Sequence, residues 1–194
     1  MSLRQRVDVV VILFAVCSFA GWVYETLENV VTFGGIYLRA SFMLPWCPIY
    51  GIGGLIILGA MEPLRKRLEK RFPKVAEVLL VSVGIFVLTA LVELAGSYVC
   101  ERIMGYVPWD YSGVPFNFDG RIAPRYTLRF VAMGLLALYG VYPFVTSWAQ
   151  RNGRSARVCA VVLVALFVLD GALEALGVWQ RAKDALVPLG INHW

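Results

Sequence analysis

Apolar stretches long enough to cross a membrane restrict the fold of this chain more than any other feature. Five of them, separated by short charged segments, run over residues 7–31, 44–61, 75–100, 127–148 and 158–179. A helix that crosses about 30 Å of hydrocarbon needs about 20 mostly apolar residues, and only helices and closed barrels satisfy their backbone hydrogen bonds there. The sequence therefore predicts an all-α, polytopic membrane helix bundle of about five transmembrane helices, forming a single integral membrane domain over residues 1–194.

The composition excludes most soluble classes of protein. Hydrophobic residues make up 59% of the 194 residues and charged residues 16%, and the mean hydropathy is +0.70. Soluble domains carry about 25% charged residues, so this chain has too few to cover a water-facing surface. The net charge of +5 does not indicate nucleic-acid binding, because the basic residues form short clusters between apolar runs, as in membrane proteins. We expect the lipid bilayer as a partner, and no nucleic acid.

The distribution of basic residues between the loops predicts the orientation. Most of the loop lysines and arginines fall on one side, at the N-terminus and in the segments 65–74 and 151–157. Cytoplasmic loops carry the excess of Lys and Arg. We therefore expect a multi-pass protein of the cell (plasma) membrane with a cytoplasmic N-terminus and, after five crossings, an extracytoplasmic C-terminus.

Carboxylates recur in the outer halves of the helices that run outward. They are Glu25, Glu28, Glu93, Glu101, Asp170 and Glu174. Spacings of three or four residues place them on shared helix faces. A charge at the bilayer centre costs about 2.5–3.5 kcal/mol on insertion scales, so these faces should point into the bundle. Two interpretations stay open: a clamp that holds the helices together, with Arg121 as a counter-ion of Glu93 or Glu101, or a site for a ligand, an ion or catalysis.

The long outer loop between the third and fourth helices is rich in aromatic and polar residues. Trp109 and Tyr111 are typical of a membrane interface. Asp110, Asn117 and Arg121 supply polar groups that can orient a ligand. The structural alternative is a lid held by its own hydrogen bonds, with Asn117 in a turn.

Prolines and glycines mark the start of the second predicted helix. Pro45 and Pro48 precede Gly51, Gly53 and Gly54. A broken helix start at membrane depth often lines a site. Equally, the prolines can simply begin the helix while the glycines let a neighbouring helix approach closely.

Four motifs resemble one bacterial family. They are Gly21-Trp22-Val23-Tyr24-Glu25; Arg39 followed by Cys47-Pro48-Ile49-Tyr50-Gly51; Glu93, Ser97 and Glu101; and Trp109-Asp110-Tyr111-Ser112 with Phe116-Asn117 and Gly120-Arg121-Ile122. The family is that of the permeases described as "Putative ABC-transporter type IV". Trp46 departs from its pattern. The resemblance implies an integral membrane transport permease and adds Arg39 and Tyr50 to the candidate site residues.

The sequence lacks the motifs of several enzyme classes. It has no phosphate-binding loop, so an ABC transporter built from this chain needs a separate ATPase subunit. It has no nucleophile elbow and no zinc-protease motif, and no pattern indicates a cofactor or a metal site. Five helices are few for a complete transporter, which favours a homo-oligomer or a partner subunit.

Three functional hypotheses follow. The first is a transport component that binds a small solute, or the polar head of an amphiphile, in an acidic, arginine-balanced site in the outer half of the bilayer. The second is a membrane-embedded enzyme acting on a lipid or an isoprenoid, with Glu25, Glu93 or Glu101 as general acid or base and Arg121 holding a phosphate. The third is a non-catalytic membrane partner or scaffold.

Overall fold

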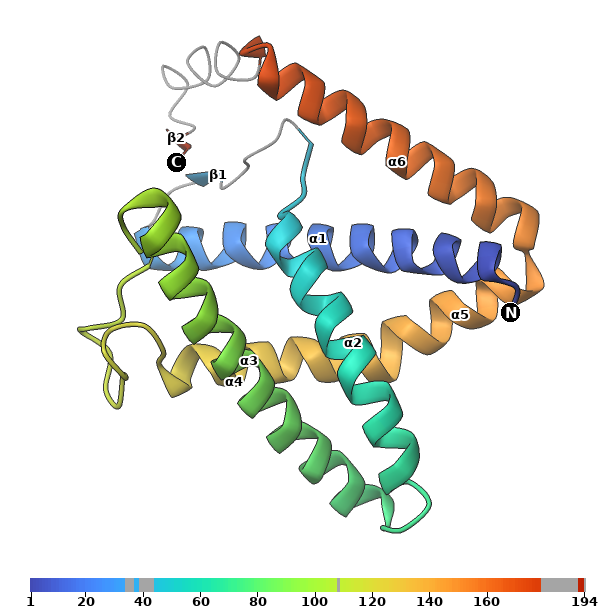
Figure 1. Cartoon of the computed structure of the whole chain (residues 1–194), viewed down its shortest axis with the longest axis horizontal. Coiled ribbons are helices and arrows are strands. Elements are labelled where there is room, and N and C mark those ends of the chain that lie inside the picture. Colours follow the sequence, from blue (N-terminus) through green and yellow to red (C-terminus); the bar gives the residue numbers. More distant parts are fainter. Residues whose placement is uncertain (34–36, 39–43, 108, 179–191, 194) are drawn as a thin grey trace. The chain divides into compact units, whose positions relative to one another are not determined.

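The computed structural model describes residues 1–33, 37–38, 44–107, 109–178 and 192–193 (Figure 1). These residues are almost entirely helical, which confirms the all-α fold class. In chain order the elements are α1 (Leu3–Phe33), β1 (Tyr37–Leu38), α2 (Pro48–Leu68), α3 (Lys74–Met104), α4 (Pro124–Leu136), the π-helical turn η1 (Ala137–Val141), α5 (Tyr142–Arg151), α6 (Gly153–Ala175) and β2 (Asn192–His193). The two short strands pair in parallel.

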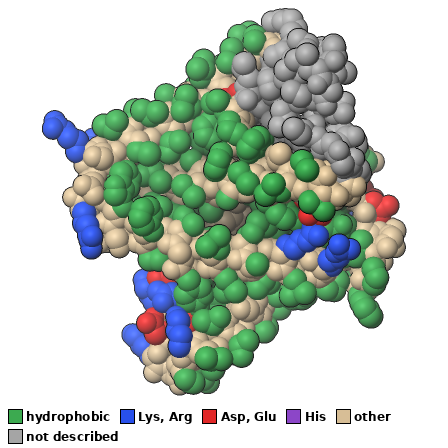
Figure 2. Space-filling view, turned by 180° about the vertical axis from the view of Figure 1, so that it is seen from behind, with side chains coloured by type: hydrophobic (Ala, Val, Ile, Leu, Met, Phe, Trp, Pro, Cys, Tyr) green, Lys and Arg blue, Asp and Glu red, His purple; other side chains and the backbone are tan. Residues whose placement is uncertain are grey.

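Four helices in the described part of the chain are long and apolar enough to cross a membrane. They are Leu3–Thr32, Lys74–Met104, Pro124–Arg151 and Gly153–Ala175. Hydrophobic side chains cover most of the face seen in Figure 2, and the Lys and Arg side chains gather in a few small groups. A surface of this kind is stable in contact with lipid and unstable in contact with water.

The second predicted helix differs from the expected span. It begins at Pro48 rather than at residue 44, because Pro45 and Pro48 lack the N–H donors of a helix interior and proline is favoured in a first turn. Its uncharged part, from Pro48 to Met61, covers about 20 Å at about 1.5 Å per residue. This is less than the hydrocarbon thickness of about 30 Å, so α2 is absent from the four helices above.

The chain folds into two compact units. Unit 1 comprises residues 1–55 and 142–194, and unit 2 comprises residues 56–141.

In unit 1, α1 packs against α5 and α6. Leu13 of α1, Val145 of α5 and Ala160 of α6 are buried in this packing. The first residues of α2 also lie close to α1, since a Cβ atom on Gly54 would lie 2.7 Å from Cys17 Sγ and one on Gly51 would overlap the Phe14 ring. These two glycines of α2 therefore serve close packing, one of the two roles open from the sequence, whereas Gly53 has open space beside it.

In unit 2, α3 packs against α4. Val81 and Ile85 of α3 and Thr127 of α4 are fully buried. The predicted fourth helix, 127–148, is present as the continuous run from α4 to α5, but the π-helical turn within it is not predicted by hydropathy. The turn ends at Val141, and Pro143 is the second residue after it. Proline has no N–H to donate to the carbonyl four residues before it, and this missing hydrogen bond favours the wider π-helical turn.

Candidate functional site

Arg121 organises the loop between α3 and α4 in unit 2. Its guanidinium donates hydrogen bonds to Glu101 (Nη2–Oε2, 2.8 Å), Asp119 (Nε–Oδ2, 3.1 Å) and Ser97 (Nη1–Oγ, 3.2 Å). It also lies 4.2 Å from the centre of the Tyr98 ring. The hydrogen bonds to Glu101 and Asp119 raise the pKa of Arg121. Arg121 therefore pairs with Glu101, one of the two carboxylates expected for it.

Glu93, the other carboxylate expected to pair with Arg121, instead accepts hydrogen bonds from uncharged hydroxyl groups. Its Oε2 accepts a hydrogen bond from Thr127 Oγ1 at 3.2 Å, and its Oε1 lies 3.4 Å from the Tyr111 hydroxyl. The Tyr111 ring stacks on Tyr126, with ring centres 4.5 Å apart. Glu93 of α3 thus contacts both α4 and the loop between α3 and α4.

Backbone contacts close the loop on itself. Trp109 Nε1 donates to the backbone carbonyl oxygen of Arg121 at 2.9 Å, and the backbone N–H of Tyr111 donates to Gly120 O at 2.8 Å. Gly120 has a φ of 64°, and a Cβ atom there would lie 2.6 Å from Ser112 Oγ. This position requires glycine.

Asp110 and Asn117 shape the turns of the loop. Asp110 Oδ1 accepts hydrogen bonds from the Ser112 hydroxyl at 2.6 Å and from its backbone N–H at 2.8 Å, and these bonds lower the pKa of Asp110. Asn117 Nδ2 donates to Val114 O at 2.8 Å, and its Oδ1 accepts from the Gly120 N–H at 2.9 Å. The structural role considered for Asn117 is thus present in the geometry.

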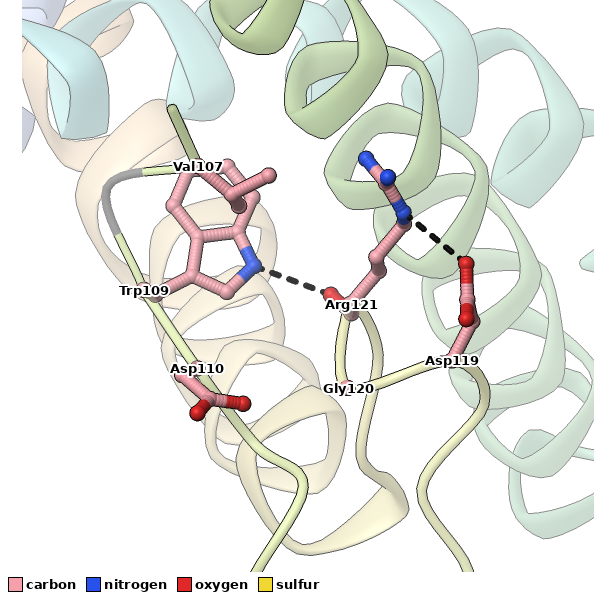
Figure 3. Close-up of a pocket in the computed structure, with 6 residues that line it drawn as sticks. All are labelled: Val107, Trp109, Asp110, Asp119, Gly120 and Arg121. Carbon is pink, nitrogen blue, oxygen red and sulfur yellow. Dashed lines mark hydrogen bonds and ion pairs between the residues drawn. The ribbon is translucent and has the colours of Figure 1, made fainter. Parts of the chain in front are cut away.

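A pocket of about 210 Å³ opens on this loop. Its lining residues are Val107, Trp109, Asp110, Asp119, Gly120 and Arg121. Figure 3 shows the Trp109 indole on one side and the Asp119 carboxylate on the other, with the Asp110 carboxylate below. Arg121 is the positively charged residue of the lining. Its guanidinium forms ion pairs with Asp119 through Nε and with Glu101 through Nη2. Two carboxylates and an aromatic ring suit a cationic ligand.

Glu25 and Tyr50, the candidates of unit 1, contact each other. The Tyr50 hydroxyl donates a hydrogen bond to the Glu25 carboxylate, and the rings of Tyr24 and Tyr50 lie 6.0 Å apart. The candidate residues thus form one group in each unit. Arg39 lies outside the described residues.

Two buried carboxylates have partners that the sequence does not predict. Asp170 in unit 1 is 1% exposed and accepts a hydrogen bond from Trp46 Nε1. In unit 2, Glu77 is 0% exposed; it lies 2.6 Å from Lys74 Nζ and accepts a hydrogen bond from the Tyr139 hydroxyl at 2.6 Å. Two features of the sequence could have indicated these contacts. One is Trp46, which departs from the family pattern, and the other is the i, i+3 spacing of Lys74 and Glu77.

Comparison with known proteins identifies the family. No curated protein and no solved structure matches the chain. One family model matches residues 12–175, a range that contains α1 to α6 almost completely and every candidate site residue. The chain therefore belongs to the family described as "Putative ABC-transporter type IV".

Proposed function

We propose that this protein is a permease-like membrane transport component that binds a cationic solute, or the cationic head of an amphiphile, in the pocket of Figure 3. The observation that carries the proposal is the charge around the pocket. Asp110 and Asp119 line it and Glu101 adjoins Arg121, so three carboxylates lie around the single guanidinium of Arg121.

The physical chemistry of the pocket favours a small cation. The lowered pKa of Asp110 keeps its carboxylate ionised at neutral pH. A cation over the Trp109 indole gains about 0.5–2 kcal/mol, depending on desolvation. The pocket is smaller than the roughly 300–1,000 Å³ of sites for drug-sized ligands, so it fits an ammonium group and its substituents rather than a whole lipid.

Glu93 is the residue that can couple binding to the helices. Tyr111 follows the pocket residue Asp110 in the chain, and its hydroxyl contacts the Glu93 carboxylate between α3 and α4. Movement of the loop on binding would change this contact and with it the proton affinity of Glu93. Glu25 with Tyr50 is the corresponding ion-coupling candidate in unit 1.

We place the N-terminus in the cytoplasm and the C-terminus outside, with the whole chain acting as one membrane domain. The clusters 65–74 and 151–157 are separated by two spans and share a side in either case, and they share it with the basic N-terminus only if the chain crosses the membrane at α2 as well as at the four longer helices. The short apolar part of α2 is compatible with a crossing next to other helices, because local thinning and snorkelling compensate for mismatch. A separate ATPase subunit or a second copy of the chain would complete the transporter.

The contacts of Arg121 favour binding over lipid catalysis. An enzyme that uses Arg121 to hold a phosphate needs free guanidinium N–H groups directed at the substrate. Here Nε, Nη1 and Nη2 each donate to a side chain of the protein, which uses three of the five N–H groups and fixes the guanidinium against Asp119 and Glu101. The charge of the pocket also repels a phosphate.

Choline and its uncharged isostere 3,3-dimethylbutan-1-ol test the proposal. We expect calorimetry on the purified protein in zwitterionic nanodiscs to show at least about tenfold tighter binding of choline, a difference of about 1.4 kcal/mol. Asp119→Asn should weaken choline binding by a similar factor. Glu69→Gln, which removes an exposed carboxylate outside the pocket, is the matched control and should bind choline normally. Equal binding of the two compounds would refute a cation site, and no binding of either would leave the scaffold hypothesis as the best account.

A further inference from the structure

A second cavity, of about 440 Å³, lies along the end of α5 in unit 1. Its lining residues are Pro143, Phe144, Ser147, Trp148, Arg151 and Asn152. Residues four apart in a helix share a face, so these three adjacent pairs form one groove along α5. The groove is separate from the pocket of Figure 3, and no candidate site residue lines it.

The groove changes from apolar to polar along the helix. Pro143, Phe144 and Trp148 supply apolar surface, and the Phe144 side chain is 73% exposed. Ser147, Arg151 and Asn152 supply polar groups toward the end of α5. Within the part of the chain that the structure describes, Arg151 is exposed and makes no ion pair. A ligand of this groove must therefore be an amphiphile whose head accepts hydrogen bonds from a cation.

The charges around the groove specify an anionic head. The N-terminal end of α1 lies beside the turn between α5 and α6 (Figure 1) and brings Arg4 and Arg6 to the same end of unit 1 as Arg151 and Arg154. Asp8, the acid of this end of α1, is buried and lies 3.2 Å from Arg157 Nη1. The charge of Asp8 is thus already balanced, and this end of unit 1 is strongly positive.

The position of the groove matches the interface of a bilayer. Arg151 is the last residue of the membrane-spanning run Pro124–Arg151. Tryptophan and arginine near the end of a span lie at the level of the lipid headgroups. Phe144, two turns earlier, lies at the level of the acyl chains.

We propose that this groove binds an anionic phospholipid, with the phosphate held by Arg151 and an acyl chain lying along Phe144 and Trp148. The negative head of such a lipid complements the charge of Arg151, and its acyl chain complements the apolar surface of Phe144 and Trp148. A zwitterionic lipid also carries a phosphate, but the surrounding arginines repel its quaternary ammonium group, and a small anion would leave the apolar surface unused. The inference does not depend on the proposed transport function.

Native mass spectrometry with phosphatidylglycerol and phosphatidylcholine of identical chains tests the proposal on the full chain. We expect tighter binding of phosphatidylglycerol, and Arg151→Gln should weaken it by about fivefold, because one basic residue near an anionic lipid contributes about 1 kcal/mol. Arg154→Gln makes the same charge change outside the groove and should weaken binding by less than about twofold. Phe144→Ser should weaken binding of both lipids.

Two further measurements distinguish a lipid site from diffuse charge attraction and from a site for a small anion. Arg151→Lys keeps the charge and should bind phosphatidylglycerol within about twofold of the wild type. Glycerol phosphate, the head without chains, should not compete. Equal effects of the Arg151 and Arg154 substitutions would show diffuse attraction and overturn the site, as would equal binding of the two lipids, displacement of lipid by glycerol phosphate, or covering of the groove by a second copy of the chain.

Discussion

The indole Nε1 of Trp46 lies 2.9 Å from Oδ2 of Asp170, which is buried in unit 1. The backbone N–H of Leu44 donates to the same oxygen at 3.1 Å, and the Trp46 ring stacks on Phe167 with centres 4.2 Å apart. The segment that precedes α2 is thus attached to α6 through an intramembrane carboxylate. Asp170 therefore fits the interpretation in which the acidic residues hold the helices together, and the Trp46 indole is one of its hydrogen-bond donors.

Trp46→Phe tests this clamp. The phenylalanine keeps an aromatic ring for the stack but removes the indole donor, so Asp170 loses a hydrogen bond in a buried site. We expect the free energy of unfolding to fall by about 1–3 kcal/mol, measured by denaturant titration in detergent. Trp22→Phe is the control, since the Trp22 indole makes no hydrogen bond to any residue that the structure describes. Equal effects of the two substitutions would show that only ring size matters.

Substitution of Arg121 should destabilise the loop between α3 and α4. Arg121→Ala removes three hydrogen bonds and the ion pairs with Glu101 and Asp119, and we expect a Tm several degrees lower in detergent. Arg121→Lys should recover only part of the loss, because an ammonium group lacks the planar fork that reaches three acceptors at once. An unchanged Tm in both variants would mean that water replaces these contacts without cost.

Glu93→Gln separates a functional carboxylate from a structural one. The amide oxygen can still accept from Thr127, so we expect a nearly normal Tm and nearly normal choline binding, while exchange of labelled choline across proteoliposomes is lost. Glu25→Gln should have the same effect in unit 1, with Glu69→Gln as a control that exchanges normally. Full exchange by the Glu93 variant would show that this carboxylate is part of the scaffold.

The lowered pKa of Asp110 predicts a pH dependence of stability. An Asp whose pKa is lower in the folded state than in the unfolded state, where it is about 3.9, stabilises the fold above that value. The contribution is lost as the pH falls through the lowered folded pKa. Ser112→Ala removes the hydroxyl donor, so its Tm should be lower than that of the wild type at pH 7 and approach it at strongly acidic pH. Parallel pH profiles of the two proteins would contradict a role for this hydrogen bond.

The proposed topology is tested with reporter tags. A tag in the turn between α2 and α3, within the segment 65–74, should report the cytoplasm, and a tag after Trp194 should report the outside. Cys47 should react faster than Cys159 with a membrane-impermeant thiol reagent on intact cells, since the orientation places Cys47 near the outer face. A basic turn on the outside would reverse the orientation and place the pocket of Figure 3 on the cytoplasmic side.

The helices could be predicted because a helix that spans a membrane appears in the sequence as an apolar run about as long as the helix itself. The run 75–100 corresponds to α3 (Lys74–Met104), which extends the expected segment by only a few residues at each end. Helix α6 ends at Ala175 rather than at residue 179, although the sequence stays apolar up to Trp179. Hydropathy also gives no sign of the π-helical turn before Pro143, because that feature depends on backbone hydrogen bonds.

The site was predictable where charge alone selects a partner. An arginine partly withdrawn from water favours a carboxylate partner, and Arg121 has Glu101. Sequence reasoning could not choose between Glu93 and Glu101, because both lie on α3 at helical spacing and the path of the loop decides which one Arg121 reaches. The sequence also could not assign Asp119 to Arg121 in particular, since the position of Asp119 depends on its own positive φ of 54° and on that of Gly120.

All the residues that line the pocket of Figure 3 lie between positions 107 and 121, and the hydrogen bonds that close the loop join residues 109 to 122. The proposed ligand-binding surface is therefore contained in one continuous segment of the sequence, encoded by one short piece of the gene. Its specificity can change by exchange of that piece while the helices keep their sequence. A chimaera that receives this segment from another member of the family should acquire the ligand preference of the donor.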